Sequence, residues 1–270
     1  MRRLLPVLLI CALAPLAAAC GAEDEVKSAV DPVAQAATKT QNAGTVEVAM
    51  TGKVSAAGQE IPLNGEGAFD LKGKRGHITL TTSVPGQGDI EVEEIIDGLV
   101  LYMRSDAFSK GLPGGKKWLK IDLKEAGKKA GVDLAQLQQL SGGSSDPTQF
   151  LTYLSKAGDV EKVGTDDVNG TSTTHYHATI DLDKLAGSAG SAADSVRQLK
   201  QLSGLEKLPT DIWIDGDQHV RRQTVAISVQ QPVATKFNLT IDYKRFGVPV
   251  DVQAPPADET VDYSAVAGGG

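Results

Sequence analysis

The feature that most constrains this chain is a period-two alternation of apolar and polar residues that recurs along most of its length. It is clear in "TVEVAMTGKV" from Thr45 to Val54 and in "HITLTTSV" from His77 to Val84. Successive side chains of a β-strand point to opposite faces, so each such segment is apolar on one face and polar on the other. The apolar positions are Val46, Val48, Met50, Leu63, Phe69, Ile78, Leu80, Ile90, Val92, Ile96, Tyr176, Ala178, Ile180, Ile212, Ile214, Val225, Ile227, Val229, Phe237, Leu239, Ile241 and Tyr243. The pattern is typical of half-buried antiparallel strands.

Turn residues separate these segments at short range. Asp97-Gly98, Asn169-Gly170 and Asp215-Gly216 each lie between two alternating runs. Asn-Gly and Asp-Gly accept the positive φ angles of type I′ turns, which are the strongest short-range signal for a hairpin. The sequence therefore predicts meandering neighbours and not parallel crossovers.

Helical spacing interrupts the strands. A helix is expected over residues 32–40, with Asp31 as its N-cap and Pro32 at its first position. "DLAQLQQL" and "DPTQFLTYLSKA" predict helices between the two sets of strands, and a further helix is expected over residues 188–203. The fold class that follows is α+β, a single domain with one extensive antiparallel sheet and a few helices.

Charge excludes one class of partner. The chain carries 27 basic and 34 acidic residues, for a formal net charge of −7. Nucleic-acid binding needs a cationic footprint, so no nucleic acid is expected as a partner. The same balance gives no general attraction to anionic lipid surfaces.

The N-terminus has the features of an export signal. Arg2 and Arg3 precede an apolar run from Leu4 to Leu16, and small alanines follow it. The run is shorter than the about 20 apolar residues of a spanning helix. Cys20 follows Ala17-Ala18-Ala19, as in a bacterial lipobox, whose cysteine is acylated and becomes the first residue. Plain secretion with an unmodified Cys20 is the alternative.

Lipidation at Cys20 also accounts for the cysteine usage. The other cysteine of the chain, Cys11, lies inside the leader, so the mature chain would hold no second thiol and no disulfide. We expect a leader over residues 1–19, a lipidated tether over residues 20–30, one folded domain over residues 31–260 and a flexible tail over residues 261–270. Anchoring would place the protein on the extracytoplasmic face of the cell membrane.

Several segments resemble a known family. "LVLYMRS" followed by "GGKKWLKIDL", then "VGTDDVNGTSTTHYHATIDL", "LPTDIWIDGDQHVRRQTVAI" and "FGVPVDVQAPPADE", are similar to the LolA/LppX–LprG lipoprotein superfamily, of an actinobacterial type. The resemblance implies a curved antiparallel half-barrel whose concave face is covered by helices, with an apolar cavity between them. It also implies binding and carriage of acyl-chain lipids or glycolipids within the cell envelope. A membrane transporter is a further candidate partner. A stress-sensing or partner-binding lipoprotein with the same fold is the alternative.

Candidate cavity residues follow from strand parity and helix spacing. They are Ile78, Leu80, Leu99, Leu101, Met103, Ile180, Ile212, Ile214, Val225 and Ile227 on strands, and Leu134, Leu137, Leu151, Leu154, Val196, Leu199 and Leu202 on helices. The alternative is that the same residues pack a closed core. A monomer is expected.

No catalytic, metal or cofactor site is expected. His175 and His177 share a strand face, a spacing that metals use, but their neighbours Thr173 and Thr179 make it a solvated polar face. "DGDQHV" resembles a calcium loop, yet Ala226 stands where a bidentate Glu is required, so the hairpin interpretation is preferred. The protein is therefore interpreted as a non-enzyme.

Overall fold

The computed structural model describes residues 22–56, 58–84, 88–129, 133, 158–229 and 235–267. The strands are β1 (Thr45–Ala56), β2 (Gln59–Asp70), β3 (Arg75–Val84), β4 (Gly88–Asp97), β5 (Val100–Arg104), β6 (Trp118–Asp122), β7 (Gly158–Val168), β8 (Thr171–Asp181), β9 (Lys207–Asp215), β10 (Val220–Val229), β11 (Thr235–Phe246) and β12 (Thr260–Asp262). The helices are α1 (Ala22–Asn42), α2 (Asp106–Ser109), α3 (Leu123–Lys129), α6 (Leu182–Ser188), α7 (Ala193–Ser203) and α8 (Tyr263–Ala267), with 3₁₀ turns η1 (Pro113–Gly115), η2 (Gly190–Ala192) and η3 (Ala257–Glu259).

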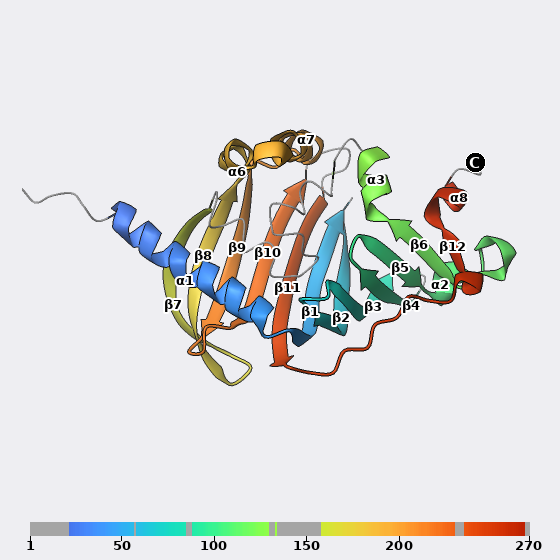
Figure 1. The fold of residues 1–270 in the computed structure, drawn as a ribbon, viewed down its shortest axis with the longest axis horizontal. Coiled ribbons are helices and arrows are strands. Elements are labelled where there is room, and N and C mark those ends of the chain that lie inside the picture. Colours follow the sequence, from blue (N-terminus) through green and yellow to red (C-terminus); the bar gives the residue numbers. More distant parts are fainter. Residues whose placement is uncertain are drawn as a thin grey trace, which may run out of the picture.

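All strands of the described part join one open sheet of 12 strands, in the order β12-β6-β5-β4-β3-β2-β1-β11-β10-β9-β8-β7 (Figure 1). The predicted α+β class with a single large sheet is confirmed. Neighbouring strands are antiparallel except at one edge, where β12 runs parallel to β6. The N-terminal and C-terminal halves meet at the β1–β11 pair, where Val48 lies opposite Tyr243.

The hairpin turns lie where they were predicted, but the three turns differ from one another in backbone geometry. Asn169 and Gly170 both have positive φ, as a type I′ turn requires. At the second site Asp97 pairs with Val100, so the turn is centred on Gly98 and Leu99, with positive φ at Gly98 alone.

The third hairpin is longer than a two-residue turn. The Asp215 carboxylate accepts hydrogen bonds from the backbone N–H groups of Asp217 and His219, and Gln218 takes the left-handed conformation. The hairpin interpretation of "DGDQHV" is therefore correct, and Asp215 is occupied in closing the turn.

Helix α1 begins ten residues earlier than the sequence predicts. It starts at Ala22, so Asp31 is not its N-cap and Pro32 lies inside the helix. A proline there removes one helical hydrogen bond, a loss that packing of the following turns can offset. The predicted boundary between residues 30 and 31 falls inside this helix, and the predicted tail contains α8 and most of β12.

The last predicted helix, over residues 188–203, corresponds to η2 followed by α7, and a separate short helix, α6, precedes it. Asp181 is the N-cap of α6, because its side chain accepts hydrogen bonds from the N–H groups of Asp183 and Lys184. Helix α7 ends at Gly204 in the left-handed conformation. The helices predicted around Leu134 and Leu151 lie outside the described residues.

Among the described residues, no helix is both long and apolar enough to cross a lipid bilayer.

Candidate functional site

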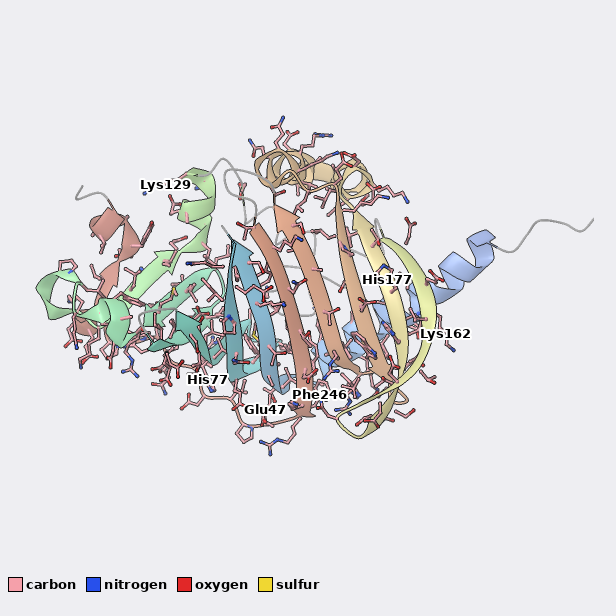
Figure 2. All side chains as sticks on the ribbon, turned by 180° about the vertical axis from the view of Figure 1, so that it is seen from behind. Glu47, His77, Lys129, Lys162, His177 and Phe246 are labelled. Carbon is pink, nitrogen blue, oxygen red and sulfur yellow. The ribbon has the colours of Figure 1, made fainter. Side chains whose placement is uncertain are left out.

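The two faces of the sheet can be separated by the register, because residues directly opposite each other in neighbouring strands share a face. One unbroken row of opposite residues runs through Ile212, Gln223, Ile241, Met50, Gly65, Leu80 and Val92. We call this face the inner face and the other the outer face. Figure 2 views the sheet from behind, where Glu47, His77 and His177 belong to the outer face.

Helices cover the inner face of β7 to β11. Helix α1 runs diagonally across this part of the sheet, and α6 and α7 lie along its upper end (Figure 1). Val33, Ala36 and Ala37 of α1 belong to one buried cluster with Val46 and Val48. We call this the packed half of the inner face.

Two buried polar contacts support the packed half. Thr40 of α1 is fully buried, and its hydroxyl accepts a hydrogen bond of 2.9 Å from the backbone N–H of Val220. Gln223 is also buried and accepts a bond from the hydroxyl of Tyr243. Buried polar groups are tolerated when they are paired, so these contacts fix α1 and β11 in register with β10.

The packed half contains some of the predicted cavity residues. Ile180, Ile212, Ile214 and Val196 are members of the buried cluster. Their side chains are at most 6% exposed, so they fill a core and leave no surface for a ligand in this arrangement. For these four residues the structure favours the closed-core alternative.

The inner face of β3 to β6 differs from the packed half. It carries apolar residues that stay partly exposed, and Ile78 alone among its predicted residues is buried. The partly exposed side chains are Leu80, Ile90, Val92, Ile96, Leu101, Met103, Leu119 and Ile121. Val225 and Ile227 are also partly exposed, although their strand, β10, is among those that the helices cover. We call the β3–β6 surface the open half.

The remaining predicted residues either lie elsewhere in the fold or fall outside the part that the structure describes. Leu99 lies in the β4–β5 turn and not on a strand face. Leu199 and Leu202 belong to α7, but their side chains lie outside the described part. Leu134, Leu137, Leu151, Leu154 and Cys20 lie outside the described residues altogether, and their roles stay predictions.

One residue of the open half was not anticipated. Glu94 lies on the inner face of β4, opposite Ile78 of β3 and Met103 of β5. Burial raises the pKa of this carboxyl above its ordinary value. The sequence contains the signal, since "EVEEII" breaks its alternation at Glu94 and places Ile95 on the outer face.

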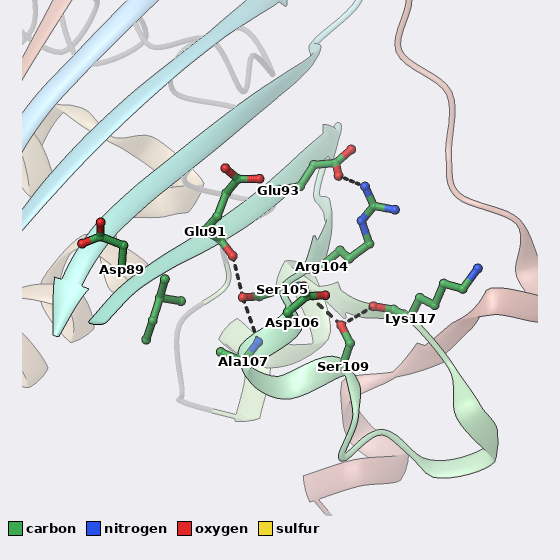
Figure 3. Close-up of a pocket in the computed structure, with 10 residues that line it drawn as sticks. Asp89, Glu91, Glu93, Arg104, Ser105, Asp106, Ala107, Ser109 and Lys117 are labelled. Atoms are coloured by element: carbon green, nitrogen blue, oxygen red, sulfur yellow. Dashed lines mark hydrogen bonds and ion pairs between the residues drawn. The ribbon is translucent and has the colours of Figure 1, made fainter. Parts of the chain in front are cut away.

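A charged pocket lies at the end of β4, and Ile90 is its one residue from the inner face. It has a volume of about 650 Å³ and is formed beside α2, mainly by outer-facing residues of β4 and by β5 (Figure 3). Asp89, Glu91 and Glu93 line it together with Arg104, which pairs with Glu93. The predicted apolar cavity is not this pocket, because charged groups on its walls would have to be desolvated by an acyl chain.

The outer face carries the two histidines that the sequence singled out. His175 stacks on Trp213 with ring centroids 4.3 Å apart, and both His175 and His177 contact the carboxylate of Asp211. Burial would raise the pKa of Asp211, but hydrogen bonds from the two histidines outweigh it and hold that pKa below its usual value. His175 is therefore less solvated than predicted.

The described residues around this histidine pair supply no third metal ligand. The described residues contain no group of three or more His, Cys, Asp or Glu placed to hold a metal ion.

No family model matches the chain. It is 28% identical over 256 residues to an uncharacterised 31.2 kDa protein of Streptomyces griseus encoded between rplA and rplJ, covering 87% of this chain and 80% of that protein. It is 27% identical over 248 residues to a protein of Streptomyces coelicolor named as a candidate lipoprotein, covering 86% of this chain and 75% of the relative.

The solved structures that are similar to this chain include LprF, the lipoprotein LppX and a LolA-superfamily protein. LprF from Mycobacterium bovis is 15% identical with a TM-score of 0.46, covering 85% of this chain and 97% of LprF. LppX from Mycobacterium tuberculosis is 15% identical with a TM-score of 0.45, covering 84% and 99%. A LolA-superfamily protein from Nitrosomonas europaea is 7% identical with a TM-score of 0.32, covering 82% and 94%. The chain is thus similar to LppX and to a LolA-superfamily protein, as the sequence resemblance predicts.

Proposed function

We propose that this chain is a membrane-anchored, extracytoplasmic lipoprotein that binds acyl-chain lipids and carries them within the cell envelope. The observation that carries the proposal is the division of the inner face. The packed half is closed by α1, α6 and α7, whereas the open half presents a continuous run of apolar side chains that stay partly exposed. Contiguous apolar surface of this kind marks interaction sites.

The chemistry of the open half suits an acyl chain. Its members are aliphatic side chains and Met103, with Glu94 as its single ionisable group. Each methylene buried against such a surface contributes about 0.8 kcal/mol. The lipoprotein naming of a relative and the lipobox at Cys20 support an anchored, exported location.

Native mass spectrometry of the Cys20→Ala protein, purified without detergent from an actinobacterial host, tests the proposal. The expected result is co-purified lipid whose mass identifies at least one acyl chain. A protein that carries no lipid and fails to bind a fluorescent acyl ester would contradict lipid carriage. That result would favour the alternative, a stress-sensing or partner-binding lipoprotein.

A further inference from the structure

The inner face of β1 to β6 has one ionisable group in the part that the structure describes. The other residues that the register assigns to this face are apolar side chains, glycines and a few uncharged polar side chains. Glu94 is the exception to an otherwise uncharged, mostly apolar surface.

The neighbours of Glu94 offer it no compensation. The residues that face it from β3 and β5 are Ile78 and Met103, and along its own strand Val92 and Ile96 lie on either side. Within the described residues its carboxylate makes no hydrogen bond or ion pair. The adjacent Glu93, on the outer face, is by contrast paired with Arg104.

Solubility does not explain a carboxyl at this position. The outer face of β4 already carries Asp89, Glu91 and Glu93, and exposed charge there keeps the strand solvated. A polar group on an apolar surface costs free energy unless something hydrogen-bonds it. Leucine or valine at residue 94 would continue the alternation of Ile90 and Val92 without that cost.

We infer that Glu94 is the polar anchor of the open half and hydrogen-bonds a hydroxyl of an uncharged lipid head group whose acyl chain lies along Leu80, Leu101 and Met103. This inference rests on the proposed lipid-binding function. It adds the class of ligand, which is an acyl lipid with a free hydroxyl next to its chain, such as an acylglycerol.

Hydroxyl fits Glu94 better than the other head-group chemistries. A hydroxyl both donates and accepts, so it can pair with the ionised or the protonated carboxyl. A phosphate would be repelled by the carboxylate, and the inner face of β1 to β6 carries no described Lys or Arg to offset the repulsion. An ammonium group would have to leave water for an apolar surface, which is costly even for a paired charge.

The test compares ligands that share one acyl chain. On a Cys20→Ala background, 1-monooleoylglycerol, methyl oleate and oleoyl lysophosphatidic acid compete for a bound fluorescent acyl ester, each below its aggregation concentration. A hydrogen bond to a charged group contributes about 1.5–3 kcal/mol, which is about tenfold or more in affinity. We therefore expect monooleoylglycerol to compete at about one tenth of the methyl oleate concentration, and the phosphate lipid to compete more weakly than monooleoylglycerol.

Variants at residue 94 separate the anchor from the apolar surface. Glu94→Leu should bring the monooleoylglycerol and methyl oleate affinities together while methyl oleate still binds. Glu91→Leu is the matched control, since it makes the same change on the outer face of the same strand and should keep the tenfold preference. Glu94→Gln should keep a smaller preference, because the amide can also pair with a hydroxyl but carries no charge.

A pH series gives a second readout that does not depend on Glu94→Leu folding. Methyl oleate brings no hydrogen bond, so it should bind the protonated carboxyl more tightly. Its affinity should rise as the pH falls toward the raised pKa of Glu94, and Glu94→Gln should remove that slope. No titratable group faces Glu94 from β3 or β5, and loss of the slope in Glu94→Gln would assign it to this carboxyl.

The possible failures are distinguishable. If methyl oleate binds but monooleoylglycerol has no advantage, or Glu94→Leu keeps the advantage, the anchor is wrong while lipid binding stands. Stronger competition by the phosphate lipid, or an equal pH slope in Glu94→Gln, overturns the anchor in the same way. If none of the acyl ligands binds the Cys20→Ala protein, the proposed function fails and the anchor with it.

Discussion

Leu80 of β3 lies over Gly65 of β2, in space that a side chain at Gly65 would need. A Cβ atom added to Gly65 would lie 2.6 Å from Cδ2 of Leu80 and 3.2 Å from Cδ1 of Ile78. At Gly67, two residues along the same face, an added Cβ would lie 2.1 Å from the backbone oxygen of His77. The first conflict involves the ends of side chains, and the second involves backbone.

This difference predicts unequal costs for the same substitution. Gly65→Ala should cost about 1 kcal/mol or less, because Leu80 can rotate outward and the unfolded chain loses freedom. Gly67→Ala should cost about 3 kcal/mol, because β2 and β3 would have to separate. Urea denaturation with both variants measures the difference. Equal losses at the two positions would contradict the explanation.

The division of the inner face predicts opposite responses to added volume. Ile212 is fully buried in the packed half, whereas Leu101 is partly exposed on the open half. Ile212→Phe should overpack the core and lower the free energy of unfolding by about 1–3 kcal/mol. Leu101→Phe should leave stability nearly unchanged and weaken binding of a fluorescent acyl ester. A large stability loss at Leu101 would show that the open half is packed core instead.

An ion pair on the outer face predicts a loss of stability in acid. Nε and Nη2 of Arg222 lie 2.5 Å and 2.8 Å from the two carboxylate oxygens of Asp242. Burial would raise the pKa of Asp242, but hydrogen bonds from Arg222 and Asn169 outweigh it and lower that pKa. The stabilisation is therefore present above the unfolded pKa of about 3.9 and is lost as pH falls through the lower folded value.

Asp242→Asn should accordingly cost about 1–3 kcal/mol at neutral pH, and the difference from wild type should shrink as the solution is acidified. Asp97→Asn is the control, because Asp97 lies 3.8 Å from Arg75 and both side chains are 48% exposed. Its expected cost is about 0–1 kcal/mol. Chemical denaturation across the pH range checks both, and a constant Asp242→Asn deficit down to the most acid pH would contradict the linkage.

Thr40 predicts how firmly α1 is attached to the sheet. Thr40→Val keeps the side-chain volume but leaves the buried N–H of Val220 without its acceptor, which should cost about 1–3 kcal/mol. Thr38→Val is the matched control. Thr38 lies two residues before Thr40 in the same helix, and its hydroxyl is exposed and donates a hydrogen bond within that helix. Amide hydrogen exchange should quicken at Val220 in the first variant and stay unchanged in the second.

Local patterns predicted the strands well because they depend on neighbouring residues. The alternation in "TVEVAM" identifies β1, and Asn169-Gly170 identifies the β7–β8 turn with its correct type. Local patterns do not predict the pairing of β1 with β11, in which Val48 lies opposite Tyr243, a residue far away in the sequence. That pairing depends on how all the strands assemble around the common core, and no local sequence motif encodes it.

The sequence predicts which residues share one face of the sheet, but it does not predict which part of that face is covered by helices. Strand parity correctly groups Leu80, Leu101, Ile212 and Ile227 on one side of the sheet. Strand parity does not show which helices cover which strands, so it does not separate the packed half from the open half. Parity does not identify Glu94 either, because a charged residue interrupts the apolar repeat on which parity depends.

Anchoring at Cys20 gives the last prediction. A lipobox cysteine receives acyl chains on its thiol, and two or more chains hold a protein stably at a membrane. Cys20→Ala should abolish labelling by a palmitate analogue and move the protein from the membrane fraction into the medium. Cys11→Ala is the matched control, since it removes the other cysteine of the chain and should leave labelling and membrane association intact. Labelling that persists in Cys20→Ala, or disappears in Cys11→Ala, would refute lipidation at Cys20.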